Sequence, residues 1–194
     1  VLSYFLSGLS FREYLILSQG MQLPSYSLQD ILNHKVELPG VDHPLPLFKE
    51  YLENGYYPFF NDPGYDQRLR NVVNLTIEND IPVYANMNIA TTKKIRQLLY
   101  VVSQSVPFKP NFTKIGQTID VHRNLVTDFL YYLERAGIIA QLRNNTGGIR
   151  LLGKIEKIYL DNTNLIYALA ENRPDIGNMR ETFFLSQMKI RNKI

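Results

Sequence analysis

The most chemically suggestive spacing in the chain is GIRLLGK, residues 148–154, which has the G-x-x-x-x-G-K pattern of a phosphate-binding loop. In such a loop the lysine precedes a serine or threonine whose hydroxyl binds magnesium, but here the next residue is Ile155. The residues between the two glycines favour a strand, whereas a phosphate-binding loop presents its backbone amides to the phosphate. The four residues are Ile149, Arg150, Leu151 and Leu152. We therefore interpret the match as chance.

Other combinations of residues that could do chemistry are sparse. The three histidines, His34, His43 and His122, lack metal-ligand spacing, and the chain has no cysteine, so thiolate metal sites and disulfides are excluded. No Ser–His–Asp arrangement can be identified without tertiary contacts. We expect no catalytic, cofactor or metal site that is complete within this segment.

Side chains suited to nucleic acid gather in the middle of the chain. Residues 1–92 carry a net charge of −5 and residues 93–157 carry +7, against a total of +3. A basic block is typical of a nucleic-acid surface, although a merely solvated face has the same composition. Candidates for base contacts are Arg123, Asn124 and Thr127, at the start of an expected helix. Candidates for phosphate contacts are Lys109, Lys114, Arg143, Asn144, Asn145 and Arg150. Asp128 and Glu134 oppose such binding.

The elements that would position these side chains are mainly helical. At the N-terminal side, SFREYLIL and SLQDILNH each begin with a capping box, Ser10 with Glu13 and Ser27 with Asp30. PLFKEYLENGYYP predicts an amphipathic helix with Leu47, Tyr51 and Leu52 on one face, ended by Gly55. YDQRLRNVVNLTIENDIP predicts another that stops before Pro82, with inward residues Leu69, Val72, Val73 and Ile77. VYANMNIATT is expected to be a link.

The basic block predicts a winged helix. KKIRQLLYVVSQS is expected to be a helix with Ile95, Leu98, Leu99 and Val102 inward. Asn111 caps a second helix, Gly116 allows close helix approach, and Asp120 occupies the turn. A third helix, HRNLVTDFLYYLERA, ends at Gly137 and is expected to bury Leu125, Val126, Phe129, Leu130 and Leu133. A strand (IIAQLR), a turn (NNTGG) and a return strand (IRLL) follow.

The last segment predicts a separate, truncated α/β unit. KIYLDN is expected to be a strand, and TNLIYALA and NMRETFFLSQMKIR are expected to be helices. The fold class is therefore mainly α with a small β wing. The expected domains are a helical region at 1–92, a winged helix at 93–157 and the truncated unit at 158–194.

Several blocks in order resemble a large group of prokaryotic AAA-type ATPases. They are LSGLSFREYL, LFKEYLENGYYP, RLRNVVNLTIENDIP, VPFKPNFTKIGQTIDVHRNLVTDFLYYLERAGII and KIYLDNTNLIYAL with IGNMRETFF. In that family an ATPase core with Walker motifs precedes a helical lid, a winged helix and a restriction-endonuclease-like domain. The chain resembles the lid, the winged helix and the start of the last domain. The resemblance implies ATP and magnesium as cofactors of the core, and none in this segment.

The resemblance also suggests roles for individual residues. Glu181 matches the glutamate on the first helix of the nuclease-like domain, which supports a metal in active relatives; a surface or capping role is the alternative. Arg68 and Arg70 are both candidates for the arginine that a lid places near the nucleotide. The chain departs from the family at Asp120, where glycine is usual, and at His122, where a small hydroxyl residue is usual. The second departure alters the start of the recognition helix, so no sequence preference is carried over.

Two functions remain open. The first is a regulatory and coupling region of an AAA-type ATPase whose winged helix binds double-stranded DNA or a protein, including the ATPase core itself. The second is a stand-alone winged-helix regulator or protein-interaction module. No run approaches the ~20 apolar residues of a membrane helix. No signal peptide is recognisable either, so we expect no membrane partner and a cytoplasmic location.

Overall fold

The computed structural model describes residues 6–37, 40, 43–144, 155–171 and 175–191. The N-terminal helices are α1 (Phe11–Gln19), α2 (Leu28–Leu32), α3 (Pro44–Asn54) and α4 (Tyr65–Leu75). A π-helical turn, η1 (Thr76–Asp80), leads into α5 (Ile81–Ala85) and α6 (Ile89–Ser103). Then come α7 (Phe112–Ile119), α8 (Arg123–Arg135), β1 (Ile139–Arg143), β2 (Ile155–Leu160), α9 (Thr163–Leu169) and α10 (Ile176–Arg191). The prediction of a mainly helical fold with a small antiparallel sheet is confirmed.

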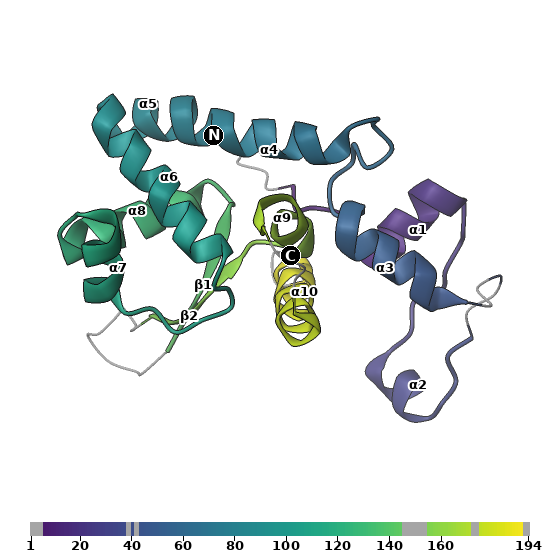
Figure 1. Cartoon of the computed structure of the whole chain (residues 1–194). Helices are drawn as coiled ribbons and strands as arrows, with labels where there is room; N and C mark the ends of the chain where they lie inside the picture. The colour runs from purple at the N-terminus through teal and green to yellow at the C-terminus, as the bar shows by residue number, and fades with distance from the viewer. Residues whose placement is uncertain (1–5, 38–39, 41–42, 145–154, 172–174, 192–194) are drawn as a thin grey trace, which may run out of the picture.

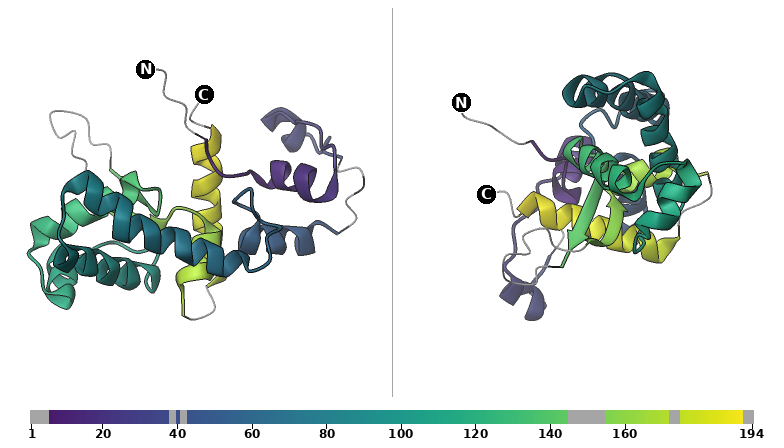
Figure 2. Two further views of the ribbon diagram at one scale, coloured as in Figure 1. Left: turned by 90° about the horizontal axis from the view of Figure 1, so that it is seen from above. Right: turned by 90° about the vertical axis from the view of Figure 1, so that its left-hand side faces the viewer.

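The molecule is elongated, with the N-terminal helices at one end and the α6–α8 unit at the other (Figure 1). The continuous run of α4, η1 and α5 lies along its length and connects the two ends. Figure 2 shows the same arrangement from above, with α10 directed across the long axis.

The capping residues seen in the sequence correctly predicted where the first helices begin and where α3 ends. Both predicted capping boxes are present, with the side-chain oxygen of Ser10 accepting from the backbone N–H of Glu13 and that of Ser27 from Asp30. Gly55 follows the last turn of α3, as expected. A small core joins α1 to α3, in which Tyr14, Leu15, Tyr51 and Leu52 are buried.

The prediction that the helix of residues 65–81 stops before Pro82 is wrong. Proline lacks a backbone N–H and crowds the preceding turn, but the chain meets this constraint with a π turn rather than a break. The backbone N–H of Ile81 donates to Thr76 O, five residues earlier. Pro82 then occupies the start of α5, where an N–H is not needed. The expected link at 83–92 is reduced to residues 86–88.

The helix–turn–helix is formed as predicted. Asn111 caps α7, and Asp120 takes the left-handed conformation with φ of 54°. A Cβ on Gly116 would lie 2.6 Å from the carbonyl oxygen of Val121, so only glycine permits this close turn. Gly137, with φ of 70°, follows the end of α8.

Two predicted core residues lie at the edge of their helix instead. Leu125 is 36% exposed and Val72 is 45% exposed. The buried stripe of α8 is Val126, Phe129, Leu130 and Leu133, and that of α4 and η1 is Leu69, Val73 and Ile77. Each misplaced residue precedes a stripe member by one position, which rotates it about 100° around the helix axis.

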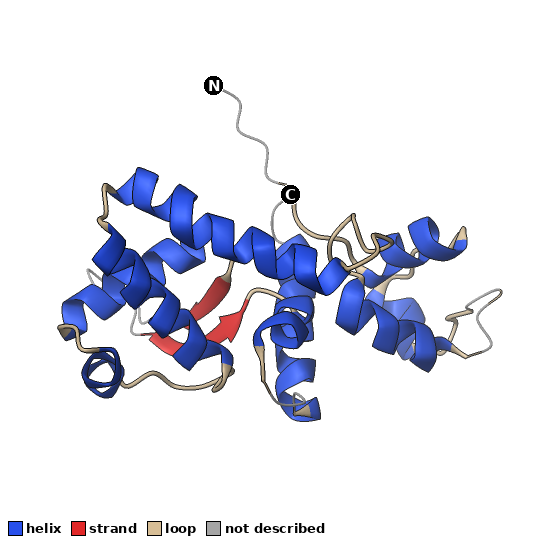
Figure 3. Ribbon diagram, turned by 45° about the horizontal axis from the view of Figure 1, so that its top comes forward, coloured by secondary structure: helices blue, strands red, loops and turns tan. Residues whose placement is uncertain are grey.

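The sheet differs from the prediction in its second strand. Figure 3 shows the two strands of the sheet side by side. β1 pairs antiparallel with β2, and Ile139 lies opposite Leu160. The return strand therefore includes residues assigned to the truncated α/β unit, and the expected boundary between 157 and 158 falls within β2. The IRLL segment and most of the predicted turn lie outside the described residues. Alternating burial could not decide which apolar run pairs with β1, because the strand choice depends on contacts across the sheet. Phe108 also bridges to Ile158, extending the sheet by an isolated pair.

One hydrophobic core runs through most of the chain. It includes Tyr65, Ile77 and Ile81 from the long helix, Leu98 from α6, Phe129 from the helix–turn–helix, and apolar residues of β2 and α9. The expected boundary at residue 92 thus separates elements that share a core. α9 lies at the centre of the molecule and contacts α3, α4, α6, α10 and β2. Within the described part, no helix has the length and apolar character needed to cross a membrane.

Candidate nucleic-acid interface

The N-terminal end of α8 presents the three candidate base-contacting residues to solvent. Arg123, Asn124 and Thr127 are all exposed, whereas Val126, Phe129 and Leu130 are fully buried. His122 caps the helix, with its Nδ1 atom 3.4 Å from the backbone N–H of Asn124. The buried stripe of α8 thus fixes which side chains face outward, as a recognition helix requires.

The turn before α8 is held from the side by α6. Lys94 donates a 2.7 Å hydrogen bond to the carbonyl oxygen of Ile119 and lies 3.7 Å from the carboxylate of Asp120. This lysine satisfies a carbonyl at the C-terminal end of α7 and fixes the direction in which α8 begins. An open hollow of about 530 Å³ lies where α7, the turn and the start of α8 meet. Its lining consists of Thr113, Gly116, Gln117, Asp120, Val121, His122 and Arg123.

The candidate phosphate-contacting residues differ in their partners. Lys109 lies 3.2 Å from Glu156, and Arg143 lies 3.3 Å from Glu134. Lys114 is exposed and has no ion-pair partner among the described residues, and the same is true of Arg123. Asn144 is exposed, and Asn145 and Arg150 lie outside the described residues. The cations without a partner are therefore on α7 and α8, and those near the sheet are partly neutralised.

The paired cations remain available to an anionic ligand. Both pairs are at least partly exposed, and exposed ion pairs contribute only about 0–1 kcal/mol to stability. A phosphate could replace either carboxylate at small cost. Asp128 is exposed on α8 and opposes an anionic ligand, as the sequence suggested.

Glu181 is engaged with β2 rather than with other acidic residues. Its two carboxylate oxygens accept hydrogen bonds of 3.0 and 2.9 Å from Lys157 Nζ, and the hydroxyl of Tyr159 donates to one of them. The hydrogen bond to Glu181 raises the pKa of Lys157 above its ordinary value. In the part of the chain that is described, no group of three histidine, aspartate or glutamate residues could hold a metal ion.

The two candidate nucleotide-facing arginines are now distinguishable. Arg68 forms an ion pair with Asp62, and its guanidinium lies over the Phe59 ring, 4.5 Å from the centroid. Arg70 is exposed and has no ion-pair partner among the described residues. Arg70 could contact a ligand directly, whereas Arg68 would first have to exchange its exposed ion pair with Asp62.

A buried polar centre around Asn164 was missed by the sequence analysis. Asn164 is fully buried, and its Oδ1 atom accepts from the Tyr56 backbone N–H at 2.8 Å and from the Tyr65 hydroxyl at 2.5 Å. Its Nδ2 atom donates to the carbonyl oxygens of Tyr51 and Leu52. This one side chain joins α9 to the end of α3 and the start of α4. Its only local signal is a polar residue within an otherwise apolar helix, which does not reveal its partners about 100 residues away.

The comparison with known proteins places most of the chain in one family. No curated protein and no solved structure is matched. Residues 45–176 match the family described as a domain of unknown function, DUF8612. This span covers more than half of the chain, from α3 to the start of α10, and includes the whole helix–turn–helix. The chain therefore belongs to the DUF8612 family.

Proposed function

We propose that this chain is the regulatory and coupling part of a cytoplasmic AAA-type ATPase, and that its winged helix binds double-stranded DNA through the N-terminal half of α8. The observation that carries the DNA proposal is the exposure of Arg123, Asn124 and Thr127 at the N-terminal end of a helix that buries Val126, Phe129, Leu130 and Leu133. Arginine and asparagine side chains can form paired hydrogen bonds with guanine and adenine edges in the major groove.

The coupling part of the proposal rests on the shared core. The long helix formed by α4, η1 and α5 packs into the same hydrophobic core as α8. Reorientation of the N-terminal helices around a nucleotide would therefore displace the winged helix as well. Arg70 is the arginine proposed to face the nucleotide.

Binding should be weak and strongly dependent on salt. Neutralising one phosphate with Lys114 gives a slope of log affinity against log salt of about −1, and recruitment of Lys109 and Arg143 would bring it to about −3. The measurement is fluorescence anisotropy with a labelled DNA duplex of mixed sequence, at low and at physiological salt.

Two substitutions separate base reading from phosphate contact. Arg123→Ala should cost about 1–3 kcal/mol on a preferred site and reduce the difference between preferred and unrelated duplexes. Lys114→Ala should weaken binding to all duplexes and reduce the salt slope by about 1. Arg180→Ala, on α10, removes an exposed cation elsewhere and is the matched control. Absence of binding at low salt, or equal effects of all three substitutions, would leave the winged helix as a protein-contact module.

The ATPase assignment has its own test. The complete gene product should contain a Walker A loop ahead of the segment described above. A complete product without such a loop would favour the stand-alone winged-helix regulator.

A further inference from the structure

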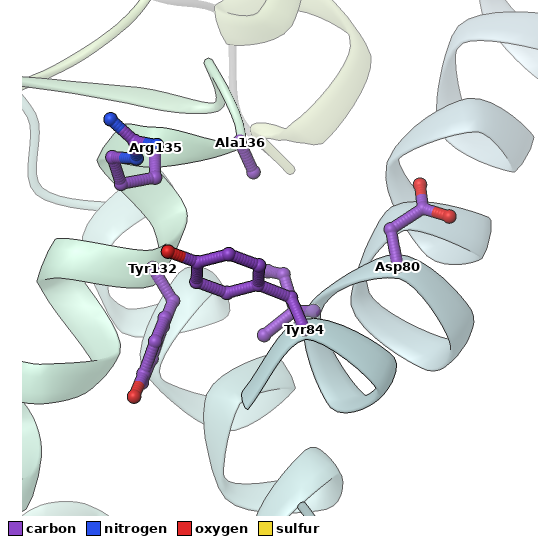
Figure 4. A pocket seen from close by; sticks show the side chains of 6 residues that line it. Asp80, Tyr84, Tyr132, Arg135 and Ala136 are labelled. Atoms are coloured by element: carbon purple, nitrogen blue, oxygen red, sulfur yellow. The ribbon is translucent and has the colours of Figure 1, made fainter. Parts of the chain in front are cut away.

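A small pocket lies at the opposite end of α8 from the candidate DNA-reading residues. It is formed where α5 meets the last turn of α8, and its volume is about 180 Å³. Six residues line it: Asp80, Ile81, Tyr84, Tyr132, Arg135 and Ala136. Because α5 and α8 contribute opposite walls (Figure 4), anything bound there touches both the long helix and the recognition helix.

The middle of the pocket is apolar and aromatic. Ile81 is buried and belongs to the main core. The rings of Tyr84 and Tyr132 lie 6.3 Å apart at 75°, and Tyr84 is 66% exposed although it is a large side chain. In Figure 4 the Tyr84 ring extends across the pocket with its hydroxyl toward Arg135. A flat ring could pack on Tyr84 and cover this exposed surface.

The two charged residues of the pocket lie on opposite sides of it. Asp80 is on the long-helix side and Arg135 is on the α8 side (Figure 4). Neither has an ion-pair or hydrogen-bond partner among the described side chains, whereas their neighbours do. Glu78 pairs with Arg96, and Glu134, adjacent to Arg135, pairs with Arg143. Asp80 and Arg135 thus both line the pocket without a charged partner among the described residues.

The size of the pocket limits what it can hold. An apolar cavity of about 150 Å³ accommodates benzene, whereas sites for drug-sized ligands occupy about 300–1,000 Å³. The pocket described above therefore fits one ring with short substituents. The π turn η1 ends at Asp80, and π-helical turns occur frequently at functional sites.

We infer that this pocket binds a small aromatic zwitterion, with its ammonium group at Asp80, its carboxylate at Arg135 and its ring against Tyr84. A ligand with opposite charges at opposite ends satisfies both unpaired residues, whereas a ligand with one charge satisfies only one. By bridging α5 and α8 it would stabilise their packing. This inference does not depend on DNA binding, because the pocket and the candidate interface lie at different ends of α8.

The test uses 4-(aminomethyl)benzoate as the probe, followed by ¹H–¹⁵N NMR of the labelled chain. Binding should shift the backbone amides of Ile81, Tyr84, Tyr132 and Ala136, with a dissociation constant on the order of 1 mM for so small a ligand. Benzoate and benzylamine each lack one charge and should bind about tenfold more weakly. Phenylalanine carries both charges at one end of its side chain and should also bind more weakly.

Variants that remove one charge each separate binding in the pocket from non-specific electrostatic attraction to the surface. Asp80→Asn and Arg135→Gln should each weaken the probe about tenfold. Asp128→Asn and Arg123→Gln make the same charge changes elsewhere on α8 and should leave its affinity unchanged. Tyr84→Ala, at an exposed position, should also weaken binding. The inference is overturned if the four amides show no saturable shift, if phenylalanine binds as well as the probe, or if the pocket and control variants behave alike.

Discussion

Replacement of Asn164 tests whether one buried side chain holds the N-terminal helices on the rest of the molecule. Asn164→Ala removes the acceptor for the Tyr56 backbone N–H and the Tyr65 hydroxyl, and the donor to two carbonyl oxygens. These partners belong to the α3–α4 region, more than 95 residues away in the sequence, with separations of 99 to 113 residues. The mutation should therefore loosen one end of the molecule from α9.

The expected magnitude follows from the hydrogen bonds that each group loses. The Tyr56 N–H is buried and would remain unsatisfied, at a cost of about 1–3 kcal/mol. The Tyr65 hydroxyl and the Leu52 carbonyl add about 1 kcal/mol each, whereas Tyr51 O keeps its 2.8 Å bond from the Gly55 N–H. We expect the free energy of unfolding to fall by about 3–5 kcal/mol in total.

The assay is urea unfolding followed by circular dichroism and by tyrosine fluorescence. With a denaturant dependence of about 2 kcal/mol per molar, the midpoint should fall by about 2 M. Asn164→Leu keeps the approximate volume without the hydrogen bonds and should be nearly as destabilising, which separates the polar contacts from the cavity. Asn71→Ala, on the exposed side of α4, removes one surface hydrogen bond to Gln67 and should change stability by no more than about 0.5 kcal/mol. A midpoint for Asn164→Ala no lower than that of Asn71→Ala would refute the proposed role.

Three further outcomes are expected. Gly116→Ala places a Cβ 2.6 Å from Val121 O and should lower the free energy of unfolding by about 1–3 kcal/mol. Gln117→Ala, at the next and exposed position, should leave the free energy of unfolding unchanged. Equal thermal midpoints of the two variants would contradict the close approach of the helices. Burial raises the pKa of Tyr14 to about 12 and the pKa values of other core tyrosines further. The buried neutral tyrosines therefore contribute fully to the free energy of unfolding below pH ~10, where tyrosines in the unfolded chain begin to ionise. This contribution is lost as the pH rises further, because only the unfolded state can then release these protons. Absorbance titration at alkaline pH should show these side chains ionising only on unfolding, and a simple titration of all tyrosines near pH 10 in the folded protein would disprove their burial. Glu181→Ala should cost no more than about 1 kcal/mol, as loss of an exposed ion pair with Lys157, and should not alter the response of the melting temperature to Mn²⁺; a manganese-dependent stabilisation lost in the variant would restore the metal role.

Local sequence signals determined the starts of α1 and α2 and the helix–turn–helix. The Ser10–Glu13 box, the Asn111 cap and the left-handed Asp120 depend on hydrogen bonds and backbone conformations within about four residues. The inward face of α8 followed from its 3.6-residue period, apart from Leu125 at the edge of the stripe. The same periodicity predicted the exposure of Asn124 and Thr127, whereas Arg123 is exposed because it lies in the first turn of α8.

Only the tertiary structure decided the features that join distant parts of the chain. Pairing of β1 with Ile155–Leu160, the continuation of the long helix past Pro82, and the burial of Asn164 each depend on which segments meet in space. The same holds for charge. The ion pairs of Lys109 and Arg143, and the lack of ion-pair partners for Asp80 and Arg135 among the described residues, depend on side-chain neighbours that sequence spacing does not predict. Helix capping and periodicity are short-range, whereas strand choice, buried hydrogen bonds and pockets are set by contacts between residues tens of positions apart.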